Sequence, residues 1–198
     1  MNPYWKFRMR ALMVALTIAG LRFAGPASDD ATAAPLPKDP CALLKAADIQ
    51  ALDPNAKIGS GVPSTQPPLG VSCQYAWGPR TPAWGETTLS ISVVDASKVY
   101  PGGLSANDIK QRVLVMVKTG GPNASEISGI GDGAVFTFET SKRTTAKGEV
   151  LTTGDAKATA FVVKAKGVIL EVTLHDGSDA LKQKDKLIAL LKVAAATL

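Results

Sequence analysis

The sequence predicts a single α+β domain with a mainly antiparallel sheet of about five strands and three helices, in the order α-β-β-α-β-β-β-α. Three observations support this prediction. Several short segments alternate apolar and polar residues, which is typical of half-buried strands. Most of these segments are joined by short turns, which favours antiparallel pairing. Three further segments combine helical apolar spacing with capping residues.

The chain begins with the layout of a secretory signal peptide, which we place at residues 1–33. Three basic residues precede an apolar run at 11–21, and Ala31-Thr32-Ala33 follows as a small-x-small cleavage pattern. A helix needs about twenty apolar residues to cross a membrane. The short run therefore favours a cleaved signal over the alternative, an uncleaved membrane anchor. No other segment is predicted to span a bilayer.

The first helix is predicted at the start of the mature domain, 39–198, after a linker at 34–38. Asp39 is expected to cap it, and Pro40 occupies the first helical position, where a missing N–H costs nothing. Asp53-Pro54 ends this helix. The following segment, up to Gly70, is rich in proline and glycine and has no hydrophobic period, so we expect an irregular loop.

Strands are predicted at 71–77 and 87–96, because apolar residues alternate along both. A second helix follows: Ser105 is the expected cap, Asp108 lies three residues on, and Gly120-Gly121-Pro122 ends it. A glycine turn at 129–133 leads into the next strand. Residues 157–175 read as two antiparallel strands, and the last helix begins near Ser178-Asp179.

The two cysteines, Cys41 and Cys73, are predicted to form one disulfide bond. An exported protein meets an oxidising environment, in which paired cysteines form disulfides. The competing interpretation is a metal or redox pair, but the sequence has no Cys-x-x-Cys spacing and only one histidine. The bond would join the first helix to the first strand, across the irregular loop.

The charge of the chain argues against nucleic-acid binding. The 198 residues carry a net charge of +5. Four of the 22 basic and two of the 17 acidic residues lie in the first 33, which leaves +3 for the rest. That charge is too small to indicate a nucleic-acid partner, although it is compatible with weak contact with a membrane surface. No metal or cofactor is predicted.

Taken together, "DPCALLKAADIQAL", "CQYAW", "GIGDGAVF" and "GVILEVTL" resemble a group of secreted bacterial domains of unknown function. Members of that group open with Asp-Pro-Cys-x-Leu-Leu and carry a second cysteine before an aromatic strand. The resemblance covers roughly residues 39–196. It implies a Cys41–Cys73 disulfide, a periplasmic or secreted location and no known catalytic residues. This chain lacks the lipobox cysteine of the group's lipoprotein members.

Tyr75, Trp77, Arg80 and Trp84 are the candidate surface for a ligand or partner. Aromatic residues and arginine are enriched in binding interfaces. The alternative for Tyr75 and Trp77 is that they pack beneath the first helix, because alternate strand positions normally face a core.

The predicted function is a non-enzymatic binding or accessory domain of the periplasm or the secreted space, with a protein or a small ligand of the cell envelope as partner. The alternatives are a structural envelope component and a small hydrolase with His175 as base. For the hydrolase, Ser128 or Ser178 would be the nucleophile, but no Gly-x-Ser-x-Gly motif is present.

Overall fold

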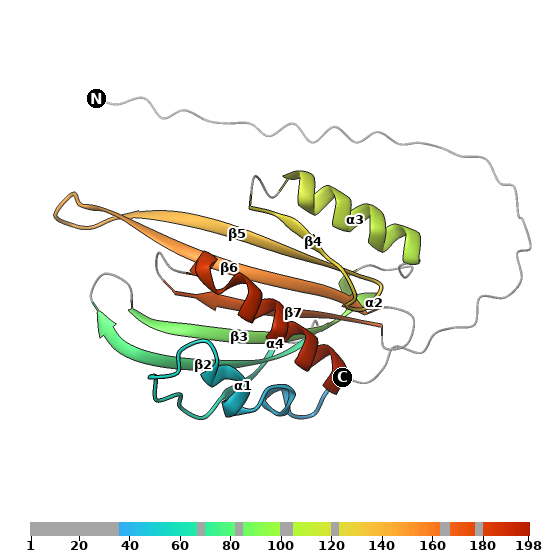
Figure 1. Cartoon of the computed structure of the whole chain (residues 1–198), viewed down its shortest axis with the longest axis horizontal. Coiled ribbons are helices and arrows are strands. Elements are labelled where there is room, and N and C mark those ends of the chain that lie inside the picture. Colours follow the sequence, from blue (N-terminus) through green and yellow to red (C-terminus); the bar gives the residue numbers. More distant parts are fainter. Residues whose placement is uncertain are drawn as a thin grey trace, which may run out of the picture. The chain divides into compact units, whose positions relative to one another are not determined.

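The computed structural model describes residues 36–66, 70–81, 85–99, 105–119, 123–162, 167–176 and 180–198. All of them fall within one compact unit, Ala31–Leu198. The predicted signal peptide at 1–33 lies outside the described residues. Figure 1 shows the strands side by side in one curved sheet, with α4 crossing the sheet on one side.

Within the described residues, seven strands form one sheet in the order β1-β2-β3-β7-β6-β5-β4. Every pair of neighbours is antiparallel. The strands are β1 Val62–Gln66, β2 Gly70–Thr81, β3 Gly85–Asp95, β4 Ser125–Ile127, β5 Gly133–Thr144, β6 Val150–Val162 and β7 Val168–His175. The α+β class and the antiparallel sheet are confirmed, whereas the expected number of about five strands is wrong.

The two additional strands, β1 and β4, lie at the edges of the sheet. β1 comes from the segment that was predicted to be an irregular loop, and it pairs with β2 from Val62↔Gln74 to Gln66↔Gly70. An edge strand tolerates a proline such as Pro63, because it needs hydrogen bonds to only one neighbour. Pairing with β2 therefore orders a segment that has no hydrophobic period of its own.

The prediction of three helices is also wrong in detail. The helical elements are η1 Pro40–Leu43, α1 Ala46–Gln50, α2 Ala96–Val99, α3 Ala106–Thr119, η2 Ala180–Gln183 and α4 Lys184–Thr197. Only α3 and α4 are long, at 14 residues each. The first predicted helix is divided because Leu44 is extended, at φ −132° and ψ 131°. This break lets both Leu43 and Leu44 reach the core, where they are buried.

The core lies between one face of the sheet and a layer made of η1, α1 and α4. Alternate residues of β3 and β7 are fully buried on this face, and leucines of α4 pack against them; the set is Leu89, Ile91, Val93, Leu170, Val172, Leu174, Leu187, Leu190 and Leu191. Burying each such side chain contributes about 1.5–3 kcal/mol relative to leaving it exposed. The apolar residues that recur at helical spacing in α4 thus pack against those that alternate along the strands.

The opposite face of the sheet is polar along most of β3 and β7. Ser90, Ser92 and Thr173 are half-buried there, and the Thr173 hydroxyl donates to Glu171 Oε1 at 3.1 Å. Val135 of β5 also points to this side, because its neighbours in the strand face the core. It is 1% exposed, and α3 contacts β5. We infer that α3 covers this end of the polar face.

The predicted cap of α3 is present. Ser105 Oγ accepts from the Asp108 backbone N–H at 3.2 Å, and Asp108 Oδ2 accepts from the Ser105 backbone N–H at 2.9 Å. The Ser105 hydroxyl also donates to Asp108 Oδ2 at 2.6 Å. These hydrogen bonds lower the pKa of the Asp108 carboxyl below its ordinary value. Two N–H groups that a helix start leaves without partners are thereby satisfied.

Replacing the cap, Ser105→Ala, is expected to lower the free energy of unfolding by about 1 kcal/mol. The substitution removes the hydroxyl that caps α3 and leaves the helix itself unchanged. Urea denaturation followed by circular dichroism measures the effect. Gln111→Ala is the control, because Gln111 is exposed on the same helix and takes no part in the cap. Equal stabilities for the two variants would contradict the prediction.

Candidate functional site

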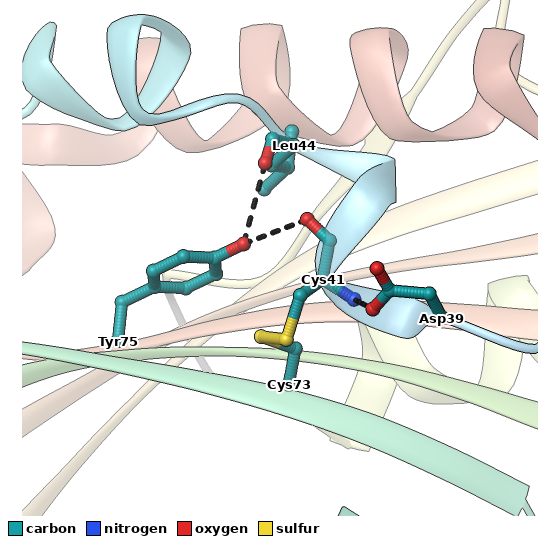
Figure 2. The surroundings of a disulfide bond; sticks show 5 residues. All are labelled: Asp39, Cys41, Leu44, Cys73 and Tyr75. Atoms are coloured by element: carbon teal, nitrogen blue, oxygen red, sulfur yellow. Dashed lines mark hydrogen bonds between the residues drawn. A yellow bond between two sulfur atoms is a disulfide. The ribbon is translucent and has the colours of Figure 1, made fainter. Parts of the chain in front are cut away.

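The disulfide bond predicted between Cys41 and Cys73 is present, with the two Cα atoms 5.1 Å apart. Figure 2 shows the bond joining η1 to β2. Asp39 Oδ1 accepts from the Cys41 backbone N–H at 2.9 Å, so the predicted cap lies beside the bond. Cys73 is fully buried. This arrangement is structural, because both sulfur atoms are consumed in the bond.

Tyr75 of β2 holds η1 and the residue after it through hydrogen bonds to their backbone (Figure 2). Its hydroxyl lies 2.9 Å from the Cys41 carbonyl oxygen and 3.2 Å from the Leu44 carbonyl oxygen, and donates to them. The side chain is 4% exposed. Burial, and secondarily the nearby Asp39 carboxylate, raise the pKa of the Tyr75 phenol above 10.0. Both effects disfavour the phenolate, which could not donate these hydrogen bonds.

The raised pKa of Tyr75 predicts a loss of stability in alkali. The folded state holds the proton more tightly than the unfolded state, so this contribution is complete below pH 10 and declines as the pH rises through the folded pKa. Stability measured by urea denaturation between pH 8 and 11 should therefore fall more steeply for the natural protein than for Tyr75→Phe. At pH 8, Tyr75→Phe should cost about 1 kcal/mol through the lost hydrogen bonds. Parallel pH profiles would contradict this assignment.

The structure describes the side chains of two of the four residues in the predicted binding surface. Tyr75 and Trp77 belong to the core and are 4% and 6% exposed, so their assignment to an open surface is corrected. They alternate in β2 on the face that packs beneath η1 and α1. Arg80 lies in β2, but its side chain is outside the described residues, as is the whole of Trp84. The prediction for those two stays a prediction.

Trp77 does, however, form part of the wall of a hollow in the protein. This hollow has a volume of about 200 Å³ and lies at the end of the core layer. The hollow lies where β2, β3 and β7 meet the loop after α1 and the short helix η2. Its lining residues are Leu52, Asp53, Pro54, Trp77, Thr87, Leu174, Asp176 and Gln183. Five separate elements therefore contribute to one concave surface.

Local interactions fix the polar groups around this hollow. Thr87 Oγ1 donates to Asp176 Oδ1 at 3.0 Å, which joins the start of β3 to the end of β7. Asp53 Oδ1 accepts from the Asn55 backbone N–H at 3.1 Å. The Gln50 amide donates to the carbonyl oxygens of Asp53 and Pro54 at 2.9 and 3.0 Å. The loop wall is thus held by α1, and each carboxylate is anchored through one oxygen.

Gln183 is the unusual member of the lining. Its Oε1 is buried and has no hydrogen-bond partner among the described residues. A buried acceptor without a partner costs about 1–3 kcal/mol, and such atoms in native proteins call for an explanation. A ligand with N–H or O–H groups would provide one. We therefore take the hollow as the candidate binding site.

A second hollow, of about 300 Å³, lies between α1 and α4. Small apolar residues make most of its wall, and Asp48 and Lys186 contribute one charge of each sign. Lys186 Nζ donates to the Leu52 carbonyl oxygen at 3.2 Å. Leu52 lines both hollows, so this residue and Lys186 form the partition between them.

The hydrolase alternative finds little support in the geometry. His175 is exposed at the end of β7, and its side chain points to the face opposite Leu174. The ladder through β5 and β6 aligns Ile127 with Leu170, five residues before His175. At about 3.3 Å per residue, Ser128 is at least about 16 Å from His175 along the strand direction. The other suggested nucleophile, Ser178, lies outside the described residues.

Comparison with protein-family models, curated proteins and solved structures found no match for the chain. The resemblance to secreted bacterial domains therefore rests on the sequence motifs alone. In the described part of the chain, every helix is too short or too polar to cross a membrane. Within the same residues, no three His, Cys, Asp or Glu side chains gather as metal ligands.

Sequence reasoning missed Asp53, Thr87, Asp176 and Gln183 as members of a site. They come from the loop after α1, strand β3, the residue that follows β7 and the 3-10 helix η2, and no spacing in the sequence connects them. Asp53 was interpreted only as a helix stop, and Asp176 only as a neighbour of His175. Their meeting depends on the pairing of β3 with β7, which aligns Thr88 with His175.

Proposed function

We propose that this protein is a non-enzymatic binding domain of the periplasm or the secreted space, and that the hollow beside Trp77 holds its ligand. The observation that carries the proposal is the convergence of an indole and two carboxylates on one concave surface, whose lining residue Gln183 also has a buried amide oxygen without a partner among the described residues. Ligand sites are concave, largely preformed and equipped with a few polar groups that set orientation.

The hollow is smaller than the roughly 300–1,000 Å³ of sites that enclose a drug-sized molecule. It fits a small molecule or the head group of a larger one. The disulfide supports the location, because such bonds persist mainly in oxidising compartments. The layout of residues 1–33 supports export on independent grounds.

Native mass spectrometry of the protein isolated from its own host tests the binding function. The expected result is an additional bound mass that Thr87→Phe removes, because the larger side chain would fill the hollow. Thr88→Phe is the matched control: the next residue of β3 is also half-buried, but it points to the opposite face. The absence of a bound mass, or its equal loss in both variants, would overturn the proposal.

The same preparation tests the location. The chain is expected to begin near residue 34 and to resist alkylation until a reductant is added, because both thiols are in the disulfide. An intact N-terminus together with two reactive thiols would contradict export.

A further inference from the structure

We propose that the hollow binds the primary ammonium group of a small amine. This inference rests on the proposed function of the hollow as a ligand site and names the chemical class of the ligand. The hydrogen-bonding capacity, charge and shape of the described lining residues support it.

The hydrogen-bonding groups around the hollow are mainly acceptors. Asp53 and Asp176 each use Oδ1 for a neighbour within the protein, and no partner of Oδ2 is found among the described residues. Gln183 Oε1 adds a third acceptor. The Thr87 hydroxyl already donates its proton to Asp176. A ligand that satisfies this set must supply several donors, and an ammonium group supplies three.

The charge of the lining is negative. Two carboxylates line the hollow, and none of its lining residues is basic. Two lysines of the adjoining helix have partners of their own: Lys184 Nζ donates to Ser125 Oγ at 2.8 Å, and Lys186 Nζ donates to the Leu52 carbonyl oxygen at the partition with the second hollow. Lys184 also lies 5.1 Å from the centre of the Phe136 ring. An anionic ligand would therefore meet repulsion, whereas a cation would be attracted.

The shape of the hollow suits the rest of such a ligand. Trp77 and Leu174 supply apolar wall for a short alkyl chain, and an indole ring attracts a cation near its face. A quaternary ammonium would gain this attraction, but it has no N–H to give to Gln183 Oε1 or to the carboxylates. The acceptors therefore favour a primary over a quaternary ammonium.

Two-dimensional NMR titration of the purified protein tests the inference with four probes: n-butylammonium, tetramethylammonium, 1-butanol and butyrate. We expect n-butylammonium to shift the Trp77 indole N–H and the amides of Thr87 and Asp176, with affinity at least tenfold above that for 1-butanol or butyrate. Tetramethylammonium should bind several-fold more weakly than n-butylammonium. Added salt should weaken binding, because part of the attraction is screened.

Variants assign the effect to the two carboxylates. Asp53→Asn and Asp176→Asn should each weaken n-butylammonium binding about threefold to tenfold, and Glu149→Gln should leave it unchanged. Glu149 is an exposed carboxylate beyond the end of β5, outside the lining. Asparagine keeps the shape of the side chain, so a folded variant with lost affinity reports the charge.

Each other outcome overturns the inference. Equal or tighter binding of 1-butanol or butyrate at the same amides would show that the hollow binds ligands but does not select ammonium, and the proposed function would stand. If no probe shifted these amides, the inference would also fail. The bound-mass experiment with Thr87→Phe would then decide the proposed function separately.

Discussion

Removal of the disulfide, by Cys41→Ala together with Cys73→Ala, is expected to lower the free energy of unfolding by about 3–4 kcal/mol. The two cysteines are 32 residues apart in the sequence. Without the bond, the unfolded chain recovers the conformational freedom of that loop. Alanine suits the buried position of Cys73, because it introduces no polar atom into the core.

Urea denaturation of the natural protein and the double variant, with and without reductant, measures this effect. In reductant, the natural protein should approach the double variant, and the double variant should not respond. A native stability of typically 5–15 kcal/mol makes the expected loss a large fraction of the total. A difference below about 1 kcal/mol would show that the bond restrains the unfolded chain little, contrary to the loop-entropy argument.

The features predicted correctly from sequence are those that local chemistry decides. Asp39 caps η1 through the Cys41 N–H, and Ser105 caps α3 as expected, with Asp108 accepting in return from the Ser105 N–H. Such caps depend on residues two or three positions apart, so the sequence contains the whole signal. The strand at 168–175 was equally readable, because its burial alternates at every residue.

The features that were missed depend on long-range contacts. β1 forms in a segment without hydrophobic period because β2 offers it an edge to pair with. The first predicted helix breaks at Leu44, where the carbonyl oxygen accepts from Tyr75, 31 residues away. The hollow joins Asp53 to Asp176 only after β3 and β7 have paired. A single sequence gives no pattern from which contacts between such distant residues could be predicted.

The second large effect is expected for Gly61→Ala, because Gly61 lies directly against the disulfide bond. A Cβ atom at position 61 would meet Cys73 Sγ, Tyr75 Cε1 at 2.8 Å and Cys41 Sγ at 2.9 Å. None of these atoms can move freely, because the sulfurs are bonded and Tyr75 is held by two carbonyl groups. We expect a loss of about 1–3 kcal/mol, the usual cost of overpacking.

Gly59→Ala is the matched control, two residues earlier in the same segment. The nearest atom to its Cβ would be the Ala76 carbonyl oxygen at 3.9 Å, an ordinary contact. At such a site the replacement should be neutral, or stabilise slightly by restricting the unfolded chain. A cost for Gly59→Ala as large as that for Gly61→Ala would show that flexibility of the segment, not contact with the disulfide, is what glycine provides.

A double-mutant cycle separates the sulfur contacts from the remaining crowding. In the Cys41→Ala, Cys73→Ala background both Sγ atoms are absent, so Gly61→Ala should cost less there than in the natural protein. Residues in direct contact show coupling energies of about 0.5–3 kcal/mol, whereas independent sites add. Coupling of that size would show that the residue before β1 packs on the bond itself, so that the disulfide positions the start of this edge strand as well as the turn above it. Additive effects would contradict the contact and leave Tyr75 as the cause of any loss.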